Sequence, residues 1–232
     1  MLFIFSRFHK DHLLFVLDFT RIDVDDSKSY QDFIVHFYYF ENGEEKALPL
    51  HFLPIDSGTP NDVDFFSSSL SDIFEEEIVK QHLKYASEII FWSDGGRHHF
   101  KQRKSMLHVL EFQKKIGINI VWNFFPSYHG HGVCDADAAQ VKRAIRKDQK
   151  ENSSIITKPQ EIVKIINSVG KHEGRIIDIS KSDHDTKSLT GISKFHNFTF
   201  NPGSMNVYAS LYSTTNSIDK TWHVTVSTRN NE

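Results

Sequence analysis

Three aspartates stand where strands or a helix would present their carboxylates to one place. Asp18 lies inside the apolar run LLFVLDFTRIDV, Asp94 directly follows the apolar run SEIIFWS, and Asp135 lies at the start of a segment with helical periodicity. A lone buried carboxylate costs several kcal/mol unless it is paired or binds a cation. Mg²⁺ prefers carboxylate oxygens, and two such ions about 4 Å apart activate a water or a 3′-hydroxyl in phosphodiester displacement. The three aspartates therefore predict a shared catalytic metal site.

Each aspartate also has a structural alternative. Asp18 could pair with Arg21, Asp94 before two glycines could be a turn residue, and Asp135 could be a helix N-cap. Asp137 competes with Asp135 for the third place. The two lie about 200° apart around a helix and flank its apolar face, so periodicity does not choose between them.

Cations cluster directly after two of these aspartates, in residues 97–104 and 142–150. A charge run is most often a solvated helix face, but its place beside the carboxylates favours phosphate contacts. The net charge of −3 is not that of a chain that binds nucleic acid over its whole surface. We predict one basic track past the aspartates, made of Lys101, Arg103, Lys104, Lys142, Arg143 and Arg146.

Two histidines, His129 and His131, lie in a glycine-rich loop before Asp135. They have no cysteine partner except Cys134, which disfavours a structural zinc site. A histidine there could move a proton or contact a phosphate, or it could be a plain loop residue. We include His129 among the expected nucleic-acid contacts.

The elements that must position these residues follow from the hydrophobic pattern, which predicts an α/β fold. Three strands come first as an antiparallel meander with an Asn-Gly hairpin, and two strands linked by helices follow. We expect one core over 1–150, with helices flanking a mixed sheet, and an α+β extension over 151–232. The expected core strands are 13–24, 32–40, 46–55, 87–92 and 117–125, and the expected core helices are 64–86, 101–115 and 134–149.

Two segments resemble motifs of transposase-derived proteins of the DDE/DDD type. SDGGRHHFKQR resembles their motif SDG-x-x-x-QFK-x-R, with His99 where glutamine is usual. NFFPSYHGHGVCDADAAQVKR resembles their FF-x-x-x-HGKG-x-x-D segment, with His131 where lysine is usual, and DFT in the first strand also fits. The resemblance covers roughly 13–147 and includes the order of elements, which is that of the ribonuclease H-like fold.

This resemblance implies a ribonuclease H-like catalytic core with Asp18, Asp94 and Asp135 as the metal-binding triad, and it chooses Asp135 over Asp137. It also implies that Lys101, Arg103, His129 and Lys142 lie near the active site or its nucleic-acid track. We expect cleavage or strand transfer on DNA with Mg²⁺ or Mn²⁺, by a transposase core or a domesticated derivative. The alternatives are a ribonuclease or structure-selective endonuclease of the same fold, and an inactive module that binds nucleic acid or protein.

The remaining expectations concern the surroundings of the protein. One cysteine allows no disulfide within the chain, and no apolar stretch is long enough to span a membrane. We expect DNA, or an RNA/DNA structure, as the partner, a nuclear location and no membrane association. The homo-oligomeric state stays open. The start MLFIFSRFHKDH is unusual for a complete protein, which leaves an upstream domain open.

Overall fold

The computed structural model describes most of the 232 residues. The described residues are 9–96, 100–125, 132–153, 155–181, 189–211 and 218–224, with the backbone alone at 185–186 and 226–227. None of the helices in these ranges is long and apolar enough to cross a membrane.

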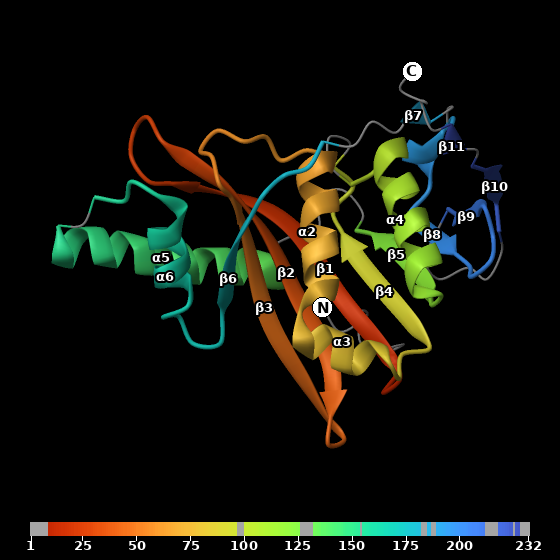
Figure 1. The fold of residues 1–232 in the computed structure, drawn as a ribbon, viewed down its shortest axis with the longest axis horizontal. Helices are drawn as coiled ribbons and strands as arrows, with labels where there is room; N and C mark the ends of the chain where they lie inside the picture. The colour runs from red at the N-terminus through yellow and green to blue at the C-terminus, as the bar shows by residue number, and fades with distance from the viewer. Residues whose placement is uncertain are drawn as a thin grey trace.

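A mixed sheet of nine strands forms the centre of the described structure, in the order β10-β9-β8-β5-β4-β1-β2-β3-β6 (Figure 1). The first three strands form the predicted antiparallel meander, and β4 and β5 continue it as parallel strands on the other side of β1. The turn between β2 and β3 uses Asn42 and Gly43 at φ 53° and 81°, as a type I′ hairpin requires. The bounds are β1 His12–Asp23, β2 Ser29–Glu41, β3 Glu44–Pro54, β4 Glu88–Ser93 and β5 Asn119–Phe124.

The chain after residue 150 adds strands to both edges of this sheet. β6 pairs in parallel with the second half of β3, while β8 pairs antiparallel with β5 and leads on to β9 and β10. The strand pair β7–β11 forms a separate small ladder. The division at residue 150 stays a prediction. The bounds are β6 Glu173–Ile177, β7 Asp185–Thr186, β8 Asn197–Phe200, β9 Asn206–Ser210, β10 Lys220–His223, β11 Val226–Ser227 and the 3₁₀ turn Ile192–Lys194.

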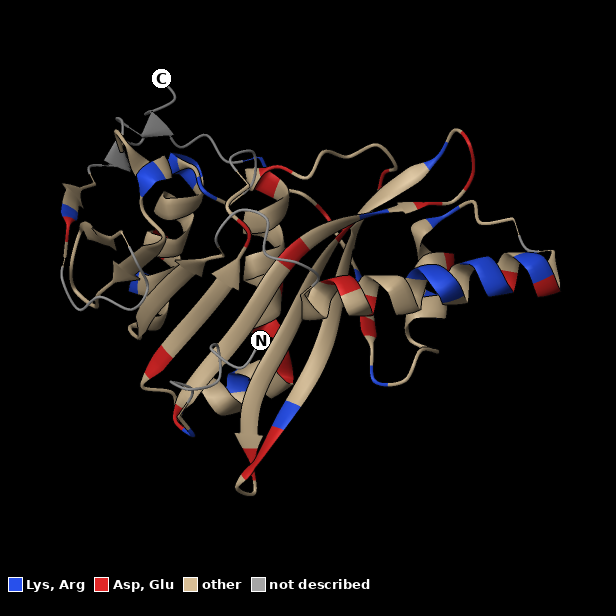
Figure 2. Ribbon diagram, turned by 180° about the vertical axis from the view of Figure 1, so that it is seen from behind, with Lys and Arg blue, Asp and Glu red and all other residues tan. Residues whose placement is uncertain are grey.

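Five helices in the described residues cover the two faces of the sheet, because both faces of its central strands are apolar. Alternate residues of β1 such as Phe15 and Leu17 pack under α2, α3 and α4. The residues between them, such as Leu14 and Val16, pack under α5 (Figures 1 and 2). The bounds are α2 Val63–Glu75, α3 Glu77–Leu83, α4 Arg103–Ile116, α5 Val133–Asn152 and α6 Pro159–Ile166.

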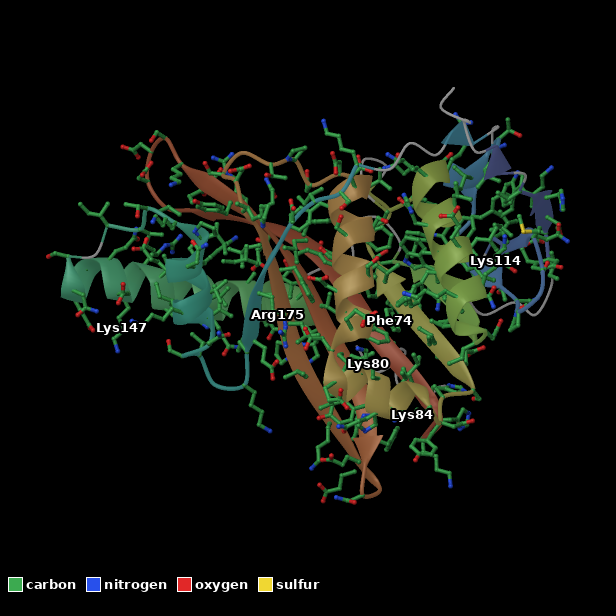
Figure 3. The ribbon with its side chains drawn as sticks, in the orientation of Figure 1. Phe74, Lys80, Lys84, Lys114, Lys147 and Arg175 are labelled. Carbon is green, nitrogen blue, oxygen red and sulfur yellow. The ribbon has the colours of Figure 1, made fainter. Side chains whose placement is uncertain are left out.

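The single helix predicted over 64–86 is wrong, because the structure divides it into α2 and α3. Glu76 between them has an extended backbone, with ψ 131°. Its carboxylate, nine-tenths buried, pairs with the guanidinium of Arg175 on β6, labelled in Figure 3. This contact joins residues 99 positions apart, so no local sequence pattern predicts the break between the two helices.

Candidate metal centre

Asp18 and Asp94 follow the end of the ladder that joins two neighbouring parallel strands. The last paired residues of β1 and β4 are Leu17 and Ser93, so Asp18 is the next residue of β1 and Asp94 directly follows β4. Asp18 is partly buried and accepts the backbone N–H of Phe19 at 2.7 Å. Asp94 is exposed and accepts the backbone N–H of Gly96 at 3.2 Å, as a turn residue does. The register therefore brings these two expected residues to one edge of the β1–β4 pair.

The first turn of α5 is fastened over β1 close to Asp18. The buried thiol of Cys134 donates to the backbone carbonyl of Val16 at 3.4 Å, two residues before Asp18. Asp135 follows on this turn with its side chain exposed, and one of its oxygens accepts the N–H of Gly132 at 2.7 Å. Asp135 is therefore not the N-cap residue but the third residue of the helix, bonded back to the cap.

The Cys134 thiol shows that several carboxylates act on one point. Its pKa is raised well above the usual value, first by burial and then by the negative charges of Asp18, Asp137 and Asp135, in that order. The carboxylates act in this direction because a nearby negative charge disfavours the thiolate. The elements β1 and α5 thus concentrate negative charge at the N-terminal end of α5, where the helix dipole favours it.

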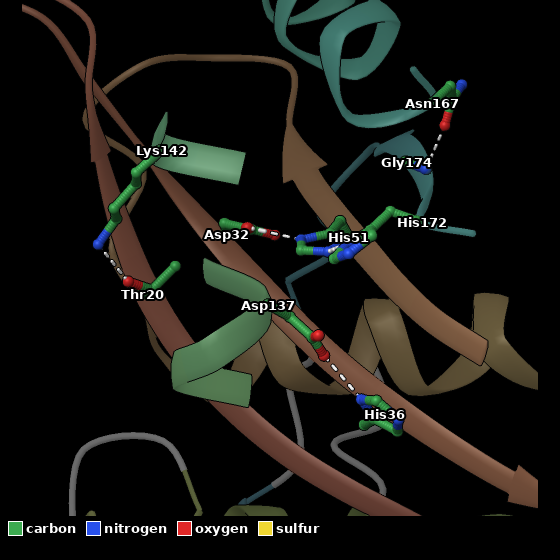
Figure 4. Close-up of polar contacts among 9 residues, drawn as sticks. All are labelled: Thr20, Asp32, His36, His51, Asp137, Lys142, Asn167, His172 and Gly174. Carbon is green, nitrogen blue, oxygen red and sulfur yellow. Dashed lines mark hydrogen bonds and ion pairs between the residues drawn. The ribbon is translucent and has the colours of Figure 1, made fainter. Parts of the chain in front are cut away.

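Asp135 and Asp137 leave α5 toward different strands. Lys142 lies on the other margin of the helix from Asp137 and donates to Thr20 Oγ1 on β1 at 2.7 Å. Asp137 Oδ2 lies 2.7 Å from His36 Nδ1 on β2, and Figure 4 shows the two contacts on opposite sides of the helix. At 100° per residue, Asp135 and Lys142 lie only about 20° apart around the helix axis. Asp135 and Asp137 lie about 160° apart, measured the shorter way round. Asp135 is thus on the margin that faces β1, beyond which lies β4.

The expected cations fall on both faces of the sheet. On α5, Lys142 contacts Thr20, while Arg143 and Arg146 are exposed. On the opposite side, Lys104 pairs with Asp64 of α2 at 2.7 Å, and Lys101 is 5% exposed with Nζ 5.2 Å from the centre of the Phe124 ring. Arg103 begins α4 and is exposed. His129 lies outside the described residues, as do His99 and His131. The nucleic-acid role of each cation stays a prediction.

A second polar cluster under α5 and α6 was not expected from the sequence. Buried Asp32 on β2 contacts His51 Nδ1 on β3 at 2.9 Å, and His51 Nε2 contacts His172 Nδ1 at 2.9 Å (Figure 4). Burial opposes a charge on His51, but Asp32 outweighs burial and raises its pKa. The pKa of His172 is lowered, first by burial and then by His51. The sequence did contain a signal for this cluster: polar residues at inward-facing positions of apolar strands, which the alternation of residues along each strand identifies.

The carboxylates do not stand at coordination distances in the part of the chain that the structure describes. No group of three His, Cys, Asp or Glu side chains there is arranged to hold a metal ion. The donor chemistry nonetheless fits a hard divalent cation, since the residues at this edge supply carboxylate oxygens.

A family model described as a domain of unknown function (DUF8701) matches residues 33–213. This range includes Asp94 and Asp135 and begins after Asp18. None of the curated proteins matches the chain.

Proposed function

Because the chain belongs to this family, the domain of unknown function DUF8701, we propose its function from its own residues. The protein cleaves or joins DNA phosphodiester bonds as a ribonuclease H-like domain, with Mg²⁺ or Mn²⁺ held by Asp18, Asp94 and Asp135. This proposal includes a nuclear location and its origin as a transposase core or a domesticated derivative.

The sheet order β3-β2-β1-β4-β5 supports the ribonuclease H-like part of the proposal. Its central strand carries Asp18, the neighbouring parallel strand ends at Ser93 directly before Asp94, and the helix after β5 carries Asp135. The observation that carries the proposal is the register of β1 and β4, whose last paired residues directly precede Asp18 and Asp94. The contact of Cys134 with Val16, which fixes the start of α5 to β1, supports it as well.

In this proposal each group of residues has a distinct role in the reaction. The three carboxylates hold the divalent ions, which when bound supply activation of the attacking oxygen and stabilisation of the leaving oxygen. Arg143 and Arg146, exposed on α5, contact the phosphates on either side of the scissile one. The N-terminal end of α5 adds partial positive charge where the phosphate would lie. Lys142 orients the margin of α5 by its hydrogen bond to Thr20.

The proposal is tested by a nuclease assay with Mn²⁺ on single-stranded DNA, duplex DNA and an RNA/DNA hybrid. Wild-type protein should cleave at least one of them, and Asp94→Asn should lower the rate by about 100-fold or more, because a metal ligand is lost. The control is Asp23→Asn, an exposed aspartate on the same sheet that pairs with Arg21. Equal cleavage by Asp94→Asn and wild type would contradict the proposal.

A non-catalytic binding module is the second candidate, favoured by two observations. The described carboxylates form no group arranged to hold a metal, while α5 presents exposed cations on one face at helical spacing, namely Arg143, Arg146, Lys147 and Lys150 (Figures 2 and 3). Binding of DNA that is unchanged by Mn²⁺, with no cleavage of any substrate, would favour this candidate.

A further inference from the structure

We infer that the contact between His36 and Asp137 is a positioning contact: it fixes the rotation of α5 about its axis and so sets where Asp135 stands relative to Asp18. The inference rests on the proposed function for its consequence, and on the geometry of α5 for its cause.

The contact joins a buried carboxylate to a mostly buried imidazole. The side chain of Asp137 is 7% exposed and that of His36 is 13% exposed, with 2.7 Å between Oδ2 and Nδ1. The His36 ring also packs on the Tyr38 ring, with 4.6 Å between their centres, which limits its rotation. A buried carboxylate without a partner is strongly unfavourable, so Asp137 holds α5 where His36 can reach it.

The contact of Asp137 holds α5 on one margin of the helix, and the hydrogen bond of Lys142 holds it on the other. The Lys142 hydrogen bond runs to β1 and the Asp137 contact runs to β2, so together they resist rotation in both directions. Cys134 between them contacts Val16 at the centre of the buried face. Of the two contacts at the margins of the helix, the Asp137 contact lies within one turn of Asp135, whereas Lys142 lies almost two turns away. The Asp137 contact therefore has more control over where Asp135 lies.

The sensitivity of the site to this rotation follows from helix dimensions. Side-chain atoms lie about 5–6 Å from the helix axis, so a rotation of about 10° moves them by about 1 Å. Catalytic groups must be held to within about 0.5 Å, so a small rotation is enough to spoil the site. The contact also keeps the charge of Asp137 directed to His36, away from the margin that carries Asp135.

The test compares two nearly isosteric replacements of His36. Asparagine keeps an N–H donor at the position of Nδ1, whereas leucine places a methyl group there. We expect His36→Leu to weaken Mn²⁺ binding, measured by calorimetry, by about tenfold or more, as loss of a partner to a metal-site element does. His36→Asn should restore the affinity to within about threefold of wild type.

Hydrogen exchange supplies a readout that needs no metal. In His36→Leu the amides of residues 136–138 should exchange faster, while those of 145–149 keep the wild-type rate. The control Ile145→Val removes one methyl group from the buried face farther along α5 and should leave Mn²⁺ affinity unchanged. If His36→Leu does not fold, Asp137→Ala provides the same comparison, because it leaves only a partly exposed imidazole behind.

The outcomes separate this inference from the proposed function. Wild-type protein that binds no Mn²⁺ would overturn both. Wild-type affinity in His36→Leu, or an equal loss in Ile145→Val, would overturn the positioning role and leave the proposed function intact. Failure of His36→Asn to restore affinity would also overturn it, because the retained donor would then be irrelevant.

Discussion

Two aspartates of the same helix show how position decides the use of a carboxylate. Asp137 is buried and contacts His36, whereas Asp135 is exposed and accepts the N–H of Gly132. Both stood as candidates from the sequence, and helical periodicity left them equal. The difference comes from the strands on either side of α5, which no pattern within the helix contains.

A stability measurement distinguishes a ligand role for Asp94 from a structural one. Asp94→Asn should leave the thermal midpoint of the metal-free protein unchanged or higher. The change removes one of several mutually repelling charges, and the amide oxygen can still accept the N–H of Gly96. The variant should lose any rise of the midpoint on addition of Mg²⁺.

The positive control for this measurement is Asp62→Ala. Asp62 is the N-cap of α2 and accepts the N–H groups of Asp64 and Phe65. Its loss should cost about 1 kcal/mol, a fall in midpoint of about 2–4 °C for a chain of this size. A comparable fall in metal-free Asp94→Asn would assign Asp94 a structural turn role instead.

At the scale of elements, the Asp32–His51–His172 chain fastens the turn after α6, and with it β6, to the edge of the meander. His51 lies on β3 and His172 on the turn that enters β6, so the chain reinforces the parallel pairing of β3 with β6. Because the two imidazoles share one hydrogen bond, only one of them can carry a proton on the facing nitrogens. Asp32 raises the pKa of His51, whereas burial and then the neighbouring His51 lower the pKa of His172.

The Asp32–His51–His172 hydrogen-bond chain predicts that protein stability is greatest at a pH near the ordinary histidine pKa of about 6.5. The raised pKa of His51 gives stability that is present below about pH 6.5 and is lost as pH rises through its folded-state pKa. The lowered pKa of His172 gives the opposite sign: stability is lost as pH falls below about 6.5, because the unfolded state then binds the proton more readily.

Thermal midpoints measured from pH 5 to 8 check this prediction. In His172→Asn the decline on the acid side should be shallower than in wild type, because the group that resists protonation is gone. His82→Asn is a suitable control, since His82 lies on α3, apart from this chain. Parallel curves for wild type and His172→Asn would show that the pair does not govern the acid limb.

At the scale of the whole molecule, the order of elements could be predicted from the sequence, but the pairing of distant segments could not. The meander, the Asn42–Gly43 turn, and the strands and helices around Asp94 and Asp135 follow from local periodicity and turn chemistry. The addition of β6 to one edge and of β8–β10 to the other depends on pairing between distant segments. The same holds for the break at Glu76 and for the His36–Asp137 contact, which joins residues 101 positions apart.

The central claim is that β1, β4 and α5 bring three carboxylates to one pair of metal ions. Crystals soaked in Mn²⁺ test it most directly, through the anomalous signal of the ions. We expect two manganese peaks about 4 Å apart, in contact with Asp18, Asp94 and Asp135. It would be contradicted by an ordered core in which any one of these carboxylates lies more than about 10 Å from the other two, too far to share such a pair.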